Sequence, residues 1–400
     1  MSDIFFYFYL THWFQVCDLA GKQTIYKRIL GEIQMLREGQ NDYRIPAGCA
    51  ISGIFSKTGK RINGENIIKS IGLMRERSNG LGGGFAGYGI YPEYKDFYAL
   101  HVFYDNQKAK DECEQFLERH FDITNLSKIP TKKIPAITNE PLIWRYFVKP
   151  LPTKLASSQL GEDEFTARTV IKVNVNIEGA YIFSCGKNMG VFKAVGYPED
   201  VGEFYKLDQY EAYSWTAHGR YPTNTPGWWG GAHPFALLDL SVVHNGEISS
   251  YDANRRFIEM YGYKCTLLTD TEVITYIIDY LCRKQGLTMK EASEVIAAPF
   301  WTTIAKKDEK EMQRLTYLRN TFSSLLITGP FSLIVGFTGG IMAINDRLKL
   351  RSMVVGEKGD TVYISSEESA IRIIEPDLDR VYAPRGGEPI IYTLNEGVKI

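Results

Sequence analysis

The order of strand-like and helix-like runs constrains the fold of this chain most. Apolar runs at 211–220 and 236–247 are predicted to be strands that end in polar motifs, and strand-like runs return between 331 and 366. In the region between them, apolar residues recur at helical spacing, and helices are expected at about 249–263, 270–284, 288–298 and 308–322. Strands on both sides of a helical block are typical of layered α+β proteins rather than of alternating βαβ units.

A separate segment with strands and a helix lies in the first half of the chain. Residues 91–165 show a β-α-β pattern with a proline-rich connection, which we interpret as an accessory insertion. The run "TVIKVNVNI" (169–177) alternates between apolar and polar residues and predicts a further strand.

Composition and charge exclude several classes of partner. The formal net charge is −1 and no basic run is long enough to follow phosphates, so nucleic acid is not expected. The aromatic run near the N-terminus is far shorter than the roughly 20 residues that span a bilayer, so no membrane is expected either. The six cysteines are scattered without a C-x-x-C pair, which fits a reducing cytoplasm and argues against a disulfide framework or a zinc ribbon.

The glycine-rich stretch "GGGFAG" satisfies the pattern G-x-G-x-x-G at Gly82, Gly84 and Gly87. A dinucleotide site requires a strand before this pattern and a helix after it, whereas here a charged, helix-like run precedes it and an aromatic strand follows. We therefore expect a flexible turn near a pocket.

Three histidines, His218, His233 and His244, lie close together in the sequence. Their spacing fits no common metal motif and no cluster of acidic ligands accompanies them, so they are interpreted as loop or core histidines and no metal site is predicted.

The motif "TDTE" predicts the start of a helix. Thr269 and Glu272 have the spacing of a capping box. Asp270 would then lie in the first turn, where the helix dipole favours its ionised form. A carboxylate in that position could also hold a substrate ammonium group.

Two further motifs allow a structural and a functional interpretation. "HNGE" contains Asn245-Gly246, which favours a turn but also offers a side-chain amide and an unhindered backbone N–H to an oxyanion. Arg220 begins a loop rich in proline and glycine, and its planar guanidinium suits a carboxylate.

The order of these motifs resembles a known family. The stretch "HGRYPTNTPGWWGGAHPFALLDLSVVHNGEI", followed by "TDTE" and preceded by Cys49, resembles the class II glutamine amidotransferase domain of the N-terminal-nucleophile (Ntn) hydrolases, most closely the glutaminase domain of glutamate synthase. The resemblance covers residues 49 to 375 apart from the segment at 91–165. It implies a four-layer α-β-β-α sandwich of two antiparallel sheets.

The resemblance also implies roles for individual residues. Cys49 would attack the side-chain amide of L-glutamine with its own α-amine as the base, and Asn245 and Gly246 would hold the oxyanion. Substrate binding is assigned to Arg220 for the α-carboxylate, to Asp270 for the α-ammonium group, and to Thr223.

A free α-amine at Cys49 requires that the preceding residues be absent, because an amide nitrogen cannot accept the proton. Residues 1–48 are therefore predicted to be a leader or propeptide, and residues 49–400 the amidotransferase domain. 

The remaining expectations concern cofactors and partners. FMN and iron–sulfur clusters would belong to partner subunits, since no cofactor is expected in this chain. The ammonia would pass to a separate glutamate-synthase-type subunit. Two alternatives stay open, a non-catalytic regulatory subunit that binds glutamine and another Ntn amidohydrolase.

Overall fold

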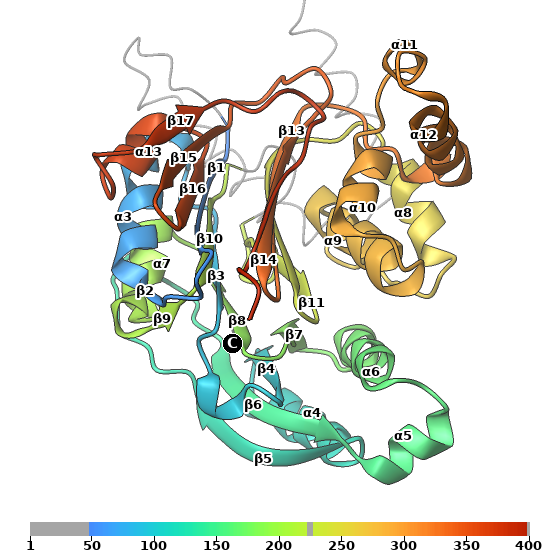
Figure 1. Cartoon of the computed structure of the whole chain (residues 1–400). Helices are drawn as coiled ribbons and strands as arrows, with labels where there is room; N and C mark the ends of the chain where they lie inside the picture. Colours follow the sequence, from blue (N-terminus) through green and yellow to red (C-terminus); the bar gives the residue numbers. More distant parts are fainter. Residues whose placement is uncertain (1–47, 222–226, 398–400) are drawn as a thin grey trace, which may run out of the picture. The chain divides into compact units, whose positions relative to one another are not determined.

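Two antiparallel sheets form the centre of the part of the chain that the computed structural model describes, residues 48–221 and 227–397 (Figure 1). Their strand orders are β17-β15-β16-β1-β10-β3-β8 and β11-β12-β13-β14-β18. The seven-stranded sheet consists of β1 (Ala50–Ser56), β3 (Gly83–Tyr88), β8 (Met189–Ala194), β10 (Ser214–Gly219), β15 (Val354–Lys358), β16 (Thr361–Ser365) and β17 (Arg380–Tyr382). The five-stranded sheet consists of β11 (Phe235–Leu237), β12 (Leu240–Gly246), β13 (Phe331–Phe337), β14 (Gly340–Asn345) and β18 (Ile390–Thr393).

The two sheets pack face to face through apolar side chains. Gly53 in the middle of β1 lies against Ile341 of β14 and Ile334 of β13, so close that a Cβ at Gly53 would be 3.1 Å from Ile341 Cδ1. Polar contacts also cross the interface: the hydroxyl of Tyr88 donates to Ser241 Oγ at 2.7 Å, and His218 Nε2 donates to the carbonyl of His244 at 2.9 Å. Strands with both faces covered are buried along their whole length, as β1, β3 and β10 are.

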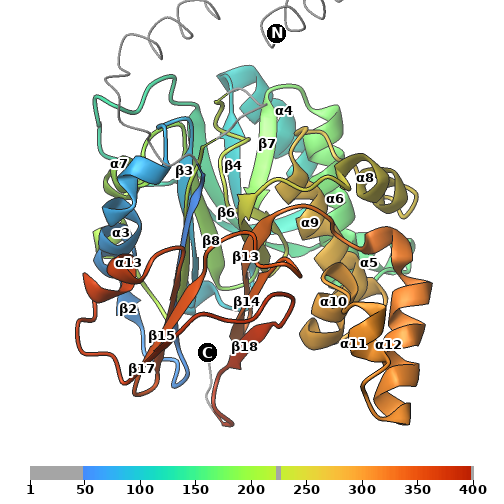
Figure 2. The same ribbon diagram turned by 90° about the horizontal axis from the view of Figure 1, so that it is seen from above.

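Helices cover the outer faces of both sheets. Contacts join α3, α7 and α13 to the seven-stranded sheet and α9 to the five-stranded sheet. Figure 2 shows these helices on either side of the paired sheets. This arrangement confirms the predicted four-layer α-β-β-α sandwich. The covering helices are α3 (Gly64–Leu73), α7 (Pro198–Phe204), α13 (Glu368–Arg372) and α9 (Asp270–Asp279).

The helical block between the strand runs was predicted correctly. After α9 the chain continues as a π-helical turn at Tyr280–Lys284. The other helices of the block are α8 (Tyr251–Glu259), α10 (Met289–Ile296), the short α11 (Trp301–Ile304) and α12 (Glu309–Thr321).

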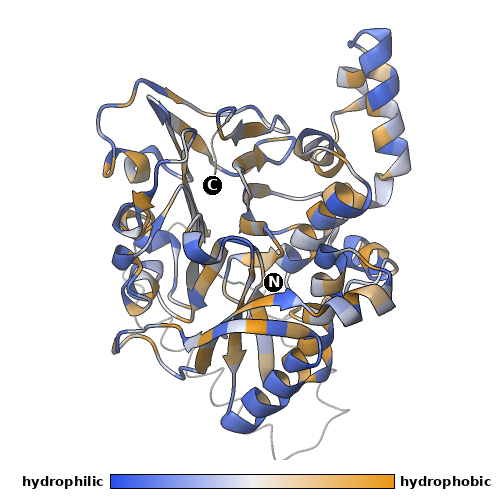
Figure 3. Cartoon of the chain, turned by 60° about the horizontal axis from the view of Figure 1, so that its bottom comes forward, coloured by the Kyte–Doolittle hydropathy of each residue, from blue (hydrophilic) through white to orange (hydrophobic). Residues whose placement is uncertain are grey.

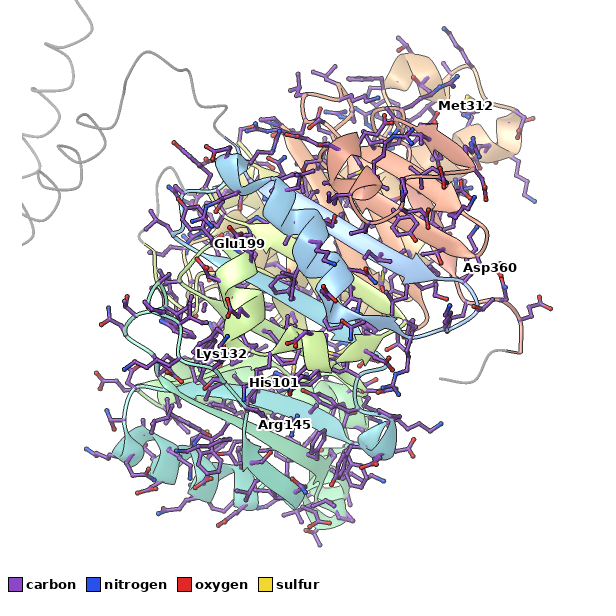
Figure 4. All side chains as sticks on the ribbon, turned by 90° about the vertical axis from the view of Figure 1, so that its left-hand side faces the viewer. His101, Lys132, Arg145, Glu199, Met312 and Asp360 are labelled. Atoms are coloured by element: carbon purple, nitrogen blue, oxygen red, sulfur yellow. The ribbon has the colours of Figure 1, made fainter. Side chains whose placement is uncertain are left out.

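A third sheet of four strands lies beside this sandwich, and its neighbouring strands follow the order β5-β6-β4-β7. We call these strands with α4, α5 and α6 the accessory sheet region. Figure 4 shows two of its side chains, His101 on β4 and Arg145 on β6, which are paired positions of neighbouring strands. Its elements are β4 (Tyr98–Tyr104), α4 (Gln107–Glu118), β5 (Phe121–Lys128), β6 (Leu142–Pro150), α5 (Pro152–Ser158), α6 (Glu162–Asn176) and β7 (Ala180–Ser184).

The predicted accessory segment, residues 91–165, contains three of these four strands. The fourth strand, β7, lies beyond it, so the sheet continues past the predicted boundary. That this region is an insertion stays a prediction.

The strand predicted at residues 169–177 is wrong, because these residues belong to α6. Phe165, Thr169 and Val173 are buried at a spacing of four, which is the period of a helix. Three acidic residues in the first turn favour the helix start. The β-branched composition that favoured a strand is therefore overridden by packing.

Figure 3 shows hydrophobic residues along the strands of the sheets and many hydrophilic residues on the outer helices. Within the described residues, none of the helices combines the length and the apolar character needed to cross a membrane. The remaining named strands are β2 (Ile62–Asn63) and β9 (Glu211–Ala212), which pair with each other.

Candidate active site

The residues that the sequence singles out come from the ends of different elements. Cys49 directly precedes β1 and Arg220 directly follows β10, and these strands are antiparallel neighbours, so the two residues lie side by side. Gly246 ends β12 and Asp270 begins α9. All four residues line one cavity of about 650 Å³. The structure therefore brings together residues that are as much as 221 positions apart in the chain (270 minus 49).

Cys49 is partly exposed, and its sulfur lies in the wall of the cavity. The backbone N–H of Tyr221 donates to Sγ at 3.3 Å. Burial raises the pKa of the Cys49 thiol, although this hydrogen bond and the charges of Arg220 and Arg351 oppose the rise. The thiol is thus protonated near neutral pH and needs a base before it can act as a nucleophile.

Arg77 is a neighbour of Cys49 that the sequence analysis missed. Its Nε donates to the carbonyl oxygen of Cys49 at 3.3 Å, and its Nη1 lies 3.0 Å from the carboxylate of Glu367. In the sequence it lies in a charged, helix-like run with no motif to distinguish it. Only the approach of the short 3₁₀ helix at Arg75–Arg77 to the start of β1 shows its position.

Arg220 is buried, with 3% of its surface exposed. Its backbone N–H donates to the carbonyl of Gly82 at 2.8 Å. A Cβ at Gly82 would lie 3.0 Å from Arg220 Cδ, and the φ of Gly82 is +153°, so glycine is required there for two reasons.

The glycine-rich stretch is accordingly not the flexible turn that we predicted. Gly83–Tyr88 form β3, an inner strand between β10 and β8. A Cβ at Gly84 would lie 2.3 Å from the carbonyl oxygen of His233. The glycines allow the chain segments around the cavity to approach closely.

Asn245 and Gly246 lie at the end of a strand rather than in an isolated turn. Asn245 is fully buried, and its Oδ1 has no hydrogen-bond partner within the described part of the chain. Gly246 has φ +151°, and a Cβ there would lie 2.0 Å from the carbonyl oxygen of Pro330. No other residue fits this position without moving the backbone of β13.

Asp270 is the first residue of α9, as predicted. Its carboxylate accepts hydrogen bonds from the N–H of Ile248 and the hydroxyl of Thr271, both at 3.2 Å, and lies 3.4 Å from His244 Nδ1. Burial raises the pKa of Asp270, but His244 and these hydrogen bonds more than offset it, and the pKa falls below its usual value. The site therefore holds a stable negative charge.

The predicted capping box at the start of α9 does not form, because the side chain of Thr269 makes no cap hydrogen bond. The carboxylate of Glu272 instead accepts from the N–H groups of Leu267 at 3.0 Å and Thr266 at 3.3 Å. These two residues line the cavity, so hydrogen bonds to Glu272 connect the cavity wall to α9. Burial raises the pKa of Glu272 to about 7.

The three histidines are buried, which confirms their interpretation as core or loop histidines, and His233 and His244 also line the cavity. The rings of His218 and His233 stack with centroids 4.2 Å apart. The hydroxyl of Thr271 lies 2.7 Å from His233 Nε2 and 3.2 Å from His244 Nδ1. Burial lowers the pKa of His218 to about 3 and that of His233 well below its usual value, so both rings are neutral.

Two predictions fall on residues outside the described ranges. Thr223, predicted to bind substrate, lies in the gap between 221 and 227, and of the predicted leader (residues 1–48) all but Gly48 lie before the described residues. Both stay predictions.

Comparison with known proteins identifies the class of protein that these features define. Residues 92–381 match the family of class-II glutamine amidotransferases, and the chain belongs to that family. Cys49 and Arg77 lie before the matched range. 

Three relatives illustrate the similarity. The chain is 50% identical over 354 residues to an uncharacterized protein of Archaeoglobus fulgidus, covering 88% of this chain and 93% of that one. It is 26% identical over 232 residues to an amidophosphoribosyltransferase of Methanocaldococcus jannaschii, covering 55% of this chain and 43% of the relative. It is 25% identical over 201 residues to a glutamine–fructose-6-phosphate aminotransferase of Vibrio vulnificus, covering 48% of this chain and 31% of the relative.

Proposed function

We propose that this chain hydrolyses L-glutamine to glutamate and ammonia through Cys49 and passes the ammonia to a separate partner subunit of the glutamate synthase type. The observation that carries the proposal is that the thiol of Cys49, the guanidinium of Arg220, the carboxylate of Asp270 and the Gly246 end of β12 meet around one cavity. L-Glutamine offers a group for each of them: an amide carbon, an α-carboxylate, an α-ammonium group and a developing oxyanion.

The chemistry begins with the thiol of Cys49, which burial keeps protonated. Its proton passes to the α-amine of the same residue, and the sulfur attacks the amide carbon of the substrate. The amide oxygen takes the negative charge, held by the N–H of Gly246 and the side-chain amide of Asn245. The proton returns to the leaving nitrogen, ammonia departs, and water cleaves the thioester to give glutamate and restore the thiol.

Substrate selection rests on two buried charges of opposite sign. Arg220 binds the α-carboxylate of the substrate and Asp270 its α-ammonium group. The lowered pKa of Asp270 keeps its charge throughout the neutral range. An amide without an α-amino acid head lacks the two charged groups that these residues bind in this proposal, so it should bind more weakly.

The α-amine of Cys49 acts as a base only when residues 1–48 have been removed. Mass spectrometry of active protein gives the direct test. The expected N-terminus is Cys49, and full turnover by chains that keep the Gly48–Cys49 bond would contradict the mechanism.

The synthase partner is proposed from the motif order, whose match is to the glutaminase domain of glutamate synthase. In this proposal FMN and iron–sulfur clusters are held by the partner subunits, and the complex is cytoplasmic. The test is ammonia transfer to a glutamate-synthase-type subunit, with glutamate formation from 2-oxoglutarate as the readout. Glutamine hydrolysis without transfer to that acceptor would support the proposed hydrolase activity and contradict the proposed synthase partner.

The catalytic proposal itself is tested with Cys49→Ala in a glutamine hydrolysis assay. The expected loss is at least about 10³-fold in kcat, since the covalent route is removed. Cys282→Ala, at a partly buried thiol on the π-helical turn, serves as the control and keeps full activity.

Equal release of glutamate by wild type and Cys49→Ala would favour the non-catalytic glutamine-binding subunit instead. The other Ntn amidohydrolase is tested with Arg220→Met, because an enzyme whose substrate lacks an α-carboxylate would lose little activity on this change.

A further inference from the structure

Two guanidinium groups flank the peptide bond between Gly48 and Cys49. A Cβ at Gly48 would lie 3.4 Å from Nη1 of Arg351 and 3.7 Å from Nη2 of Arg77. The same Cβ would lie 3.8 Å from Asn245 Oδ1. The backbone just before Cys49 thus lies close to two cations and one neutral acceptor.

The two cations differ in how far their charge is neutralised. Arg77 forms an ion pair with Glu367 and also donates to the backbone of Cys49. Arg351 has no ion pair with any residue of the described ranges, and its buried Nε has no hydrogen-bond partner there. Its position is fixed by its backbone, because the side chain of Asn345, itself fully buried, donates to the Arg351 carbonyl at 2.8 Å.

An uncompensated cation in this place has a chemical consequence once Cys49 is the first residue. A free α-amine has a pKa of about 7.7–8.0, so at pH 7 most of it is protonated and cannot act as a base. A positive charge within a few ångströms disfavours the protonated amine and lowers its pKa.

We infer that Arg351 is a positioning residue for proton transfer, whose charge keeps the freed α-amine of Cys49 unprotonated near neutral pH. The inference rests on the proposed function, since it concerns the base of that reaction. The same charge acts a second time in the cycle. After the thiol proton has moved to the amine, the ammonium group beside Arg351 is destabilised and gives the proton to the departing nitrogen.

Other charges around Cys49 do not cancel this effect. Arg220 adds positive charge from β10, and Asp270 adds negative charge from α9, with His244 and Thr271 already bound to its carboxylate. Glu367 is paired with Arg77 and is about half exposed, with 44% of its side chain accessible, so solvent screens it.

The test is the pH profile of kcat/KM for L-glutamine, which reports the pKa of the free enzyme's base. Three variants of the mature chain are compared with wild type: Arg351→Met, Arg351→Lys and Arg347→Met. Arg347 lies in the same loop, but its Nη1 donates to the carbonyl of Ala298 and its guanidinium lies over Phe300, so it controls for the loss of an arginine from this loop.

Arg351→Met should move the acidic limb of the profile to higher pH by about one unit. At pH 6.5 this is roughly a tenfold loss of kcat/KM, which disappears at pH 9. Arg351→Lys should keep the wild-type limb because it keeps the charge, and Arg347→Met should also keep it.

An acidic limb of Arg351→Met that coincides with that of wild type would overturn the inference, and so would a loss of equal size at every pH. If Arg351→Met does not fold, Arg351→Gln carries the same test. Failure of the proposed function gives a different result, because wild type would then hydrolyse no glutamine at any pH.

Discussion

The accessory sheet region and the active site both contain buried histidines, but these histidines are bonded differently. His101 on β4 uses both ring nitrogens: Nδ1 donates to the carbonyl of Val191 at 2.8 Å, and Nε2 accepts from the hydroxyl of Tyr91 at 3.0 Å. This assignment follows because a carbonyl only accepts. Burial lowers the pKa of His101 to about 3, so the ring is neutral and fully bonded.

Each histidine at the active site leaves one ring nitrogen without a partner within the described residues. These atoms are His218 Nδ1, His233 Nδ1 and His244 Nε2, and Asn245 Oδ1 beside them is in the same state. Unpaired buried polar atoms cost free energy and are uncommon in folded proteins. Unpaired buried atoms also occur in the accessory sheet region, at Trp144 Nε1, Arg145 Nε and Thr166 Oγ1, so the two regions differ in the bonding of their buried histidines.

The largest expected effect comes from comparing one asparagine at the active site with one in the accessory sheet region. Asn245→Ala removes a proposed oxyanion donor and should lower kcat for glutamine hydrolysis by about 10²- to 10³-fold. Asn125→Ala on β5 removes a hydrogen bond to Tyr94 on the exposed side of the accessory sheet and should change kcat by less than about twofold. Similar losses of kcat in Asn245→Ala and Asn125→Ala would contradict a special role of Asn245 in catalysis.

A second prediction concerns the pH dependence of stability. The folded chain holds the pKa of Glu272 at about 7, above its usual value of 4.5, so folding disfavours its ionised form. The contribution of Glu272 to the free energy of unfolding is therefore greatest below pH 4.5. It is lost as pH rises to about 7, and the total loss is roughly 3 kcal/mol.

Glu272→Gln removes this titration. Urea denaturation at pH 5 and pH 8 should show the wild type losing stability relative to Glu272→Gln between the two values. Glu65→Gln, at an exposed glutamate on α3, is the control for the loss of a glutamate charge from a helix. A wild type that gains stability relative to Glu272→Gln at pH 8 would contradict the sign.

A smaller effect on substrate binding is expected at Asp270. Asp270→Asn keeps the size of the side chain but removes the charge that we propose to bind the α-ammonium group, so KM for glutamine should rise about 10- to 100-fold. Asp252→Asn on the exposed part of α8 is the matched control. An unchanged KM in a folded Asp270→Asn variant would assign the α-ammonium group to another residue.

The smallest effect on activity is expected in the accessory sheet. His101→Phe leaves the carbonyl of Val191 and the hydroxyl of Tyr91 without a partner and should lower stability by about 2 kcal/mol. Its kcat/KM should stay within about twofold of wild type. A loss above tenfold at full folding would show that this sheet positions the active site.

Much of the site was predictable because its residues end strands or begin helices. Apolar periodicity located β10, β12 and α9. Arg220 follows the end of β10, Asn245 lies near the end of β12, and Asp270 is the first residue of α9. Such ends can be predicted from the sequence, because strands and helices end where the apolar periodicity changes.

The failures share a non-local cause. The helical state of α6 depends on which of its side chains find apolar partners, and the role of Gly82 depends on Arg220, 138 positions later (220 minus 82). Glu272 was predicted to form a capping box with Thr269, but its carboxylate accepts from the backbone N–H of Leu267 in the cavity wall instead. Sequence spacing carries no information about these competing contacts.

The pairing of β1 also has a consequence for the processed chain. Chain ends usually fray, because the first residues lack neighbours to hold them. A chain that begins at Cys49 would begin beside an inner strand, with β10 on one side and β16 on the other. Its first residue, Cys49, would lie one position before a strand that is paired on both sides. Cleavage displaced by a single residue would leave either an acylated nitrogen on Cys49 or a chain that lacks this sulfur.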